Sequence, residues 1–157
     1  MQATIKAEEA SIEQVDTVAS LVKALLIELE PEAENELRQM DITQIAADLF
    51  QKGKLFAILA KDGQKPVGVL TLHECAAIYA GGLFGEISEL YVLPDYRSKQ
   101  VGQLLLDAAV EKAKQLGWKR LEVGSPPPEQ WPRTVQFYEN NQFEATGTRL
   151  RRIVKSN

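Results

Sequence analysis

Apolar residues recur three or four positions apart along the first part of the chain, which is the spacing of an amphipathic helix. The spacing predicts one helix that follows Ser11 as its N-cap and stops at Pro31, and a second helix over 42–52 that ends at Gly53. A short strand is predicted before them at 4–11. The acidic segment between the two helices, ELEPEAENELRQ, has no clear period.

The pattern changes to that of strands beyond Gly53. KLFAILAK (54–61) is a short and nearly continuous apolar run, as expected of a central strand that is buried on both faces. The turn sequence DGQKP then predicts a hairpin with a returning strand over 67–79. A further strand is predicted over 83–93, after a turn at two glycines.

Helical spacing returns over 101–116, where Gly117 is a suitable C-cap. A strand at 118–124 then completes a strand–helix–strand unit, whose two strands are expected to be parallel. A helix over 131–141 and one or two strands within 143–155 close the chain. The predicted order is β-α-α-β-β-β-α-β-α-β(-β). We therefore expect an α/β (α+β) mixed sheet flanked by helices, in a single domain over 1–157.

Composition and charge mainly argue against certain classes of partner and site. The formal charge of −4 and a pI near 5.1 argue against nucleic acid or an anionic membrane as a partner. No apolar run reaches the roughly 20 residues that cross a bilayer, and no signal pattern opens the chain, so a cytoplasmic location is expected. Cys75 is the only cysteine and His73 the only histidine. We expect them to share one face of a strand in a packing or surface role, and we predict no metal site.

The entrance to the helix at residue 101 is the segment with the most suggestive chemistry. In PDYRSKQVGQLLL, Arg97 and Lys99 flank the point where the apolar period starts, and Gly102 removes a Cβ from the first turn. A helix N-terminus presents unpaired N–H groups and a partial positive charge, which together favour a phosphate. From composition alone, an anion site and an ordinary solvated cap are equally good interpretations.

The wider stretch ELYVLPDYRSKQVGQLLLDAAVEKAKQLGWKRLEV resembles the signature region of the GNAT superfamily of acyl-CoA N-acyltransferases. In that family a Q/R-x-x-G-x-G/A loop grips the pyrophosphate of coenzyme A with its backbone amides. Gln100 stands here where the family has its first glycine, and Ser98 where a glycine is frequent. The resemblance implies an acetyl-CoA site along the strand end and the loop. Its residues would be Leu90, Tyr91, Val92, Leu93, Arg97, Ser98, Lys99, Gln100, Val101, Gly102 and Gln103.

A second match lies downstream, where QFYENNQFEATG resembles the family's F-Y-x-x-x-G-F-x-x-x-G segment with Gln142 in place of a glycine. The resemblance makes Tyr138 the candidate general acid for the departing thiolate; the alternative is that it only packs beside the cofactor sulfur. A backbone N–H near Val92 would polarise the thioester carbonyl.

Glu86 and Glu89 are the candidates for the general base, because the resemblance places a carboxylate on this strand. Three residues apart on a regular strand they would point to opposite faces, so only one could face the acceptor unless a bulge intervenes. The sequence does not separate the two.

The resemblance implies an N-acetyltransferase that uses acetyl-CoA and acts on a primary amine of a small molecule or peptide, by direct attack in a ternary complex. A catalytically weak CoA-binding sensor with the same fold is the alternative, and a toxin acting on charged transfer RNA is a third, which the negative charge disfavours. A homodimer is also compatible with the family. The acids between the first two helices are candidates for attracting a cationic acceptor, against a plain solvated loop.

Overall fold

The computed structural model describes residues 4–155. These divide into two compact units, the first ending at Leu121 and the second beginning at Glu122. Each unit is described by itself, and the single domain expected over 1–157 stays a prediction.

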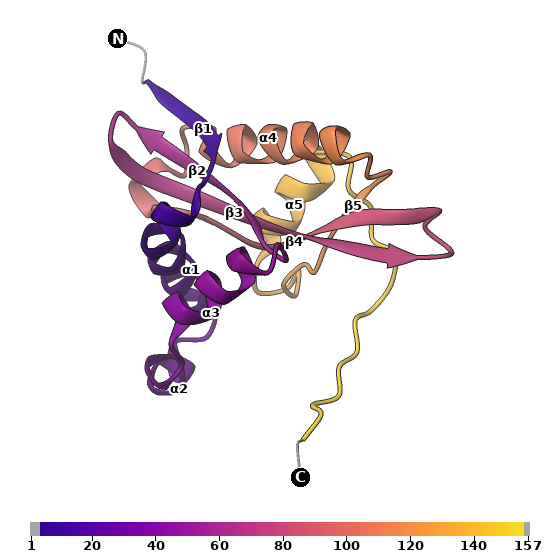
Figure 1. Ribbon diagram of the computed structural model, residues 1–157, viewed down its shortest axis with the longest axis horizontal. Coiled ribbons are helices and arrows are strands. Elements are labelled where there is room, and N and C mark those ends of the chain that lie inside the picture. The colour runs from indigo at the N-terminus through magenta and orange to yellow at the C-terminus, as the bar shows by residue number, and fades with distance from the viewer. Residues whose placement is uncertain (1–3, 156–157) are drawn as a thin grey trace. The chain divides into compact units, whose positions relative to one another are not determined.

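The first unit contains most of the regular structure, and its elements follow the expected order except for one further short helix, α2, which forms in the acidic segment that showed no clear period (Figure 1). Its helices are α1 (Val15–Leu29), α2 (Glu34–Gln39), α3 (Ile42–Gln51) and α4 (Val101–Leu116), with short 3₁₀ turns at Ile12–Gln14, Pro31–Ala33 and Pro94–Tyr96. Its strands are β1 (Ile5–Glu9), β2 (Phe56–Asp62), β3 (Lys65–Ala77) and β4 (Gly82–Val92). Strand β5 (Leu121–Val123) begins at its last residue.

The strands form one mixed sheet in the order β1-β2-β3-β4-β5, in which the pairs β1–β2, β2–β3 and β3–β4 are antiparallel. Helix α4 connects β4 to β5, as the predicted crossover requires. The N–H of Gly85 in β4 bonds the carbonyl of Arg120, just before β5, at 3.1 Å. The fold is therefore the expected α/β class.

Helices cover both faces of the sheet in the first unit. Helix α1 contacts β3 and β4, and its Val18, Leu21 and Val22 pack in one cluster with Ala57, Leu59, Val69 and Tyr91 of the sheet. Helix α4 lies on the opposite face, where a Cβ on Gly68 would meet Leu105 at 3.1 Å and Val101 at 3.2 Å. The missing side chain of Gly68 thus lets the start of α4 approach β3 closely.

The second unit is built around α5 (Pro132–Asn140). Tyr138 stacks edge-on between Phe137 and Phe143, with ring centroids 5.4 Å apart in each pair. The closing strands expected over 143–155 do not form, and this segment has no regular structure. Its apolar side chains Leu150 and Val154 are 89% and 90% exposed, so the alternation that resembled a strand has no surface against which to pack.

Candidate functional site

The loop before α4 has the backbone shape that the family pattern requires of a glycine. Gln100 lies at φ 62° and ψ 22°, in the left-handed region, and α4 begins at the next residue. Gln142, the other glutamine at a family glycine position, is also left-handed at φ 73°. Both glutamines therefore adopt the conformation that glycine takes most readily, and the chain bears the strain of a Cβ at each place.

The first N–H groups of α4 follow this left-handed residue at the open end of the helix. The N–H of Leu104 makes the first helical bond, to the carbonyl of Gln100 at 3.1 Å. The N–H groups at Val101, Gly102 and Gln103 come before that bond and have no acceptor within the helix. These main-chain donors at the positive end of a helix of 16 residues are the candidate anion cradle.

The two basic residues that flank the helix entrance make different contacts. Arg97 bonds Glu28 of α1 at 2.7 Å and the carbonyl of Val92 at 2.9 Å. The hydrogen bond with Glu28 raises the pKa of Arg97 further. Its charge is therefore paired, and the guanidinium ties the loop to α1 and to the end of β4. Lys99 lies over the ring of Tyr96 at 5.0 Å.

The end of β4 offers backbone groups on the edge away from β3. The N–H of Leu93 bonds the carbonyl of Val67 at 2.9 Å, so the main-chain groups of Val92 point to the other edge of an antiparallel strand. The bond from Arg97 to the Val92 carbonyl agrees with this direction. The same alternation directs the groups of Leu90 to that edge.

A β-bulge decides where the two candidate bases point. Thr71 is opposite Glu89 and Leu72 is opposite Ile87, so Ser88 is an extra residue in β4. Glu86 is opposite His73, two positions from Thr71. Opposing residues share a face, and so do residues two apart on one strand. Glu86 and Glu89 therefore lie on the same face, contrary to the expectation for a regular strand.

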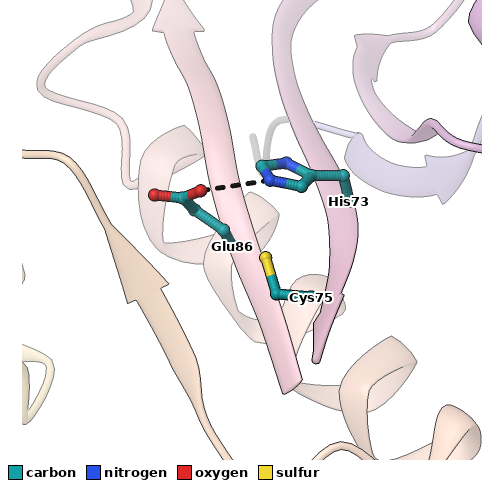
Figure 2. A group of neighbouring side chains, drawn as sticks. All are labelled: His73, Cys75 and Glu86. Atoms are coloured by element: carbon teal, nitrogen blue, oxygen red, sulfur yellow. Dashed lines mark ion pairs between the residues drawn. The ribbon is translucent and has the colours of Figure 1, made fainter. Parts of the chain in front are cut away.

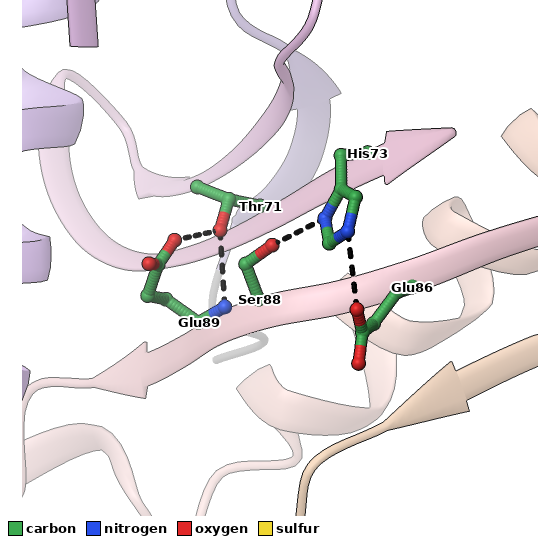
Figure 3. A network of polar contacts seen from close by, with 5 residues as sticks. All are labelled: Thr71, His73, Glu86, Ser88 and Glu89. Carbon is green, nitrogen blue, oxygen red and sulfur yellow. Dashed lines mark hydrogen bonds and ion pairs between the residues drawn. The ribbon is translucent and has the colours of Figure 1, made fainter. Parts of the chain in front are cut away.

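Polar contacts hold these side chains in two groups (Figure 3). The Thr71 hydroxyl accepts the N–H of Glu89 at 3.0 Å and is bonded to the carboxylate of the same residue. His73 bonds Ser88 through Nδ1 at 2.7 Å and pairs with Glu86 through Nε2 at 3.1 Å. Thr71 is 1% exposed, so the position of the Glu89 carboxylate is set by a buried hydroxyl.

A cavity of about 330 Å³ opens on this face of the sheet, beneath α1 and α3. Its walls are mostly apolar side chains, and Thr71, Ser88 and Glu89 supply polar groups at the strands. The full lining is Val18, Ala19, Val22, Ile42, Ile45, Ala46, Leu49, Lys54, Leu55, Thr71, His73, Glu74, Ser88 and Glu89. The volume is at the small end of the roughly 300–1,000 Å³ usual for ligand pockets.

Several residues of this cavity are absent from the sequence-based candidates. Thr71 and Ser88 are ordinary strand residues in sequence, and only the pairing of β3 with a bulged β4 brings them to Glu89. His73 was expected in a packing or surface role, yet it lines the cavity. The acids expected to attract the acceptor lie elsewhere: Glu28 pairs with Arg97, and Glu34 pairs with Arg38 within α2.

Tyr138, the candidate acid, belongs to the second unit and is 6% exposed. Burial raises the pKa of its phenol to about 12. The hydroxyl therefore stays protonated throughout the neutral range, which is the state that a proton donor requires.

No described helix combines the length and the apolar character needed to cross a membrane. The expectation of no metal site stays a prediction, although the register of β3 and β4 brings His73, Cys75 and Glu86 together.

The model of the acetyltransferase (GNAT) family matches residues 20–142. An aminoalkylphosphonate N-acetyltransferase of Salmonella typhimurium is 31% identical over 117 residues, which cover 74% of this chain and 71% of that protein.

Among solved structures, an aminoglycoside acetyltransferase from an uncultured soil metagenomic sample has a TM-score of 0.81 at 15% identity, covering 97% of this chain and 99% of its own. An aminoglycoside N-acetyltransferase in complex with CoA has a TM-score of 0.76 at 12% identity, covering 99% and 98%. The family match spans most of the sheet and the α4 entrance, and the structural likeness extends over the fold, so this chain belongs to the GNAT family of acyl-CoA-dependent acetyltransferases.

Proposed function

We propose that this protein transfers an acetyl group from acetyl-CoA to a small primary amine, with both substrates bound at once. The observation that carries the proposal is the pairing of Glu89 with Thr71 beside the bulge at Ser88, which places Glu89 in the lining of the cavity beneath α1 and α3. A ligand-sized cavity with one fixed carboxylate suits an amine that must lose a proton before it attacks.

The pyrophosphate of acetyl-CoA would bind the main-chain donors at Val101, Gly102 and Gln103. The left-handed backbone of Gln100 supports this, because it leaves these N–H groups at the open end of α4. The pantetheine arm would lie along the edge of β4 away from β3, to which Leu90 and Val92 direct their main-chain groups. A Val92 N–H in this place could stabilise negative charge on the thioester oxygen.

Glu89 is the residue that we propose as general base. It lines the cavity and is held by the Thr71 hydroxyl, whereas Glu86 pairs with His73. The amine nitrogen would attack the thioester carbon as Glu89 takes its proton, directly or through a water molecule. The C–N bond forms, the C–S bond breaks, and the thiolate takes the phenolic proton of Tyr138. The neutral phenol of Tyr138 supports that last role.

The cavity also suggests the kind of amine. Its apolar walls favour a short hydrocarbon body, and Lys54 adds a cationic side chain to the lining. A cation there would suit an acceptor with an acidic group, and the Salmonella typhimurium relative is named for aminoalkylphosphonates. We therefore propose a small amine with an anionic end as the first acceptor class to test.

The experiment follows free CoA thiol release from acetyl-CoA across matched amines with and without a phosphonate or carboxylate group. We expect turnover, and a lower KM for the anionic amines. The Lys54→Met variant should raise KM for those amines and leave KM for the uncharged ones unchanged. Equal KM values for both groups in the unmodified protein would refute the acceptor class.

The residue roles are tested by a matched pair of substitutions. Glu89→Gln should lower kcat by about 10²–10⁴, while Glu86→Gln, which also converts a carboxylate to an amide on the same face, should lower it far less. Thermal stabilisation by acetyl-CoA should persist in both variants. Stabilisation without thiol release from any amine would favour the CoA-binding sensor instead.

A further inference from the structure

Three side chains with metal-binding atoms meet on the sheet beyond the Thr71–Glu89 pair. His73 and Cys75 are two residues apart on β3, and Glu86 is directly opposite His73 on β4. One ligand atom from each, an imidazole nitrogen, a thiol sulfur and a carboxylate oxygen, lies within 4.8 Å of the other two. Figure 2 shows the three side chains directed to the same side of the hairpin.

The spacing is close to that of a metal site. Ligands about 2.0–2.3 Å from a tetrahedral Zn²⁺ lie roughly 3.3–3.7 Å from one another. The Nε2 atom of His73 is already 3.1 Å from the Glu86 carboxylate, so a small rotation of the side chains would bring all three to an ion. The His73 side chain is 37% exposed and that of Glu86 is 15% exposed, which leaves a path for the ion.

The surroundings of His73 fit this use. Its Nδ1 atom is bonded to Ser88 Oγ at 2.7 Å, on the side of the ring away from Glu86. Metal-binding histidines usually engage their second ring nitrogen in such a bond, which orients the ring and selects the tautomer. Ser88 is the extra residue of the bulge, so the same irregularity of β4 that directs Glu89 also orients His73.

We propose that His73, Cys75 and Glu86 form a binding site for a divalent transition-metal ion, with Zn²⁺ the preferred ion. Thiolate and imidazole ligands select Zn²⁺ over Mg²⁺ or Ca²⁺, which favour oxygen ligands alone. Three protein ligands leave the fourth position of a tetrahedron to water or a small molecule. Because His73 also lines the cavity, the ion would bind at the edge of that cavity.

The chain allows a sharp test, because it has one cysteine and one histidine. Titration of the metal-free protein with Co²⁺ should give one ion per chain and a near-ultraviolet thiolate-to-cobalt charge-transfer band. That band can arise only from Cys75. Added Zn²⁺ should displace Co²⁺ and abolish the band, and bound Zn²⁺ should slow alkylation of Cys75 by iodoacetamide.

Substitutions distinguish a site formed by these three residues from non-specific binding of Co²⁺ elsewhere on the protein. The Cys75→Ser protein should lose the band, and His73→Gln and Glu86→Gln should each weaken Co²⁺ binding by at least about tenfold, judging from the 10–100-fold cost of losing an outer-shell partner. Glu74→Gln is the matched control. Glu74 lies between the two β3 ligands but bonds Trp118 at 2.8 Å, so this variant should bind Co²⁺ as the unmodified protein does.

Circular dichroism of each variant, compared with that of the unmodified protein, checks that a lost band is not a lost fold. Binding of Co²⁺ without a thiolate band, binding that Cys75→Ser leaves unchanged, or no binding at all would overturn the proposal. These measurements do not depend on turnover, so they stand apart from the proposed acetyl transfer.

Discussion

Replacing Gln100 with glycine should stabilise the protein, although it changes a single exposed residue. At φ 62° and ψ 22° the Cβ of Gln100 crowds the backbone, which costs about 1–2 kcal/mol. Glycine removes that strain but makes the unfolded chain more flexible, at a cost of about 0.4–1 kcal/mol. The difference centres on a gain of about 0.8 kcal/mol. For a chain of this length it corresponds to a rise in Tm of about 2–3 °C.

Glycine at position 103, three residues later, should destabilise the protein instead. Gln103 lies in the first turn of α4 and its side chain bonds Asp107 at 2.9 Å. Glycine is up to about 1 kcal/mol less favourable than good helix formers inside a helix, alanine being the reference, and the lost side-chain pair adds a few tenths. Gln103→Gly should therefore lower Tm by about 3 °C. Gln142 is also left-handed, at φ 73°, so Gln142→Gly should raise Tm as Gln100→Gly does.

Urea unfolding and thermal scans of the three variants provide the measurement, and acetyl-CoA titration of each folded protein gives the cofactor affinity separately. If Gln100→Gly destabilises the protein as much as Gln103→Gly, the left-handed conformation at Gln100 is refuted. An unchanged or higher affinity for acetyl-CoA in Gln100→Gly is expected, because the cradle uses main-chain donors.

Three further substitutions test other parts of the structure. In Gly85→Ala the new Cβ would lie 2.2 Å from the buried Trp118 ring, so urea unfolding should show a loss of about 1–3 kcal/mol. In Thr71→Val the N–H and the carboxylate of Glu89 lose their bonds to the Thr71 hydroxyl. The free energy of unfolding should fall by about 1–3 kcal/mol, and kcat should fall as well. Thr71→Ser keeps the hydroxyl, so its stability and kcat should be close to those of the unmodified protein. The folded-state pKa of Tyr138 is raised from 10.0 to about 12, so its contribution to stability is complete below pH 10 and declines as pH rises toward 12. Tyr138→Phe should remove that part of the alkaline decline in Tm; a decline of unchanged size would show that another group causes it.

Local periodicity located the elements that bury a continuous apolar stripe. Helix α4 runs over the residues expected of it, because Val101, Leu105 and Ala109 fall on one helical face and are fully buried. The candidate anion cradle could be proposed from the sequence, since it depends on consecutive residues and on a family pattern, and its binding of acetyl-CoA stays a prediction.

The two candidate bases could not be distinguished from the sequence. Whether Glu86 or Glu89 faces the cavity depends on the register of β4 against β3, which is set by contacts about fifteen residues apart in the chain. The alternation over 143–155 predicted a strand for a related reason. A period of two marks a segment that is able to pair, but pairing also needs a partner edge and a surface that buries one face.

The bulge at Ser88 gives β4 one residue that the pairing with β3 does not use. Deleting Ser88 would leave Glu89 opposite Thr71 and two positions from Glu86, so both carboxylates would stay on the face of the cavity. A deletion elsewhere in β4 would move the side chains on one side of it to the other face of the sheet. Position 88 is therefore the one place in the paired part of β4 where a change of length preserves the direction of both acids, and the deletion would remove the hydroxyl that bonds His73.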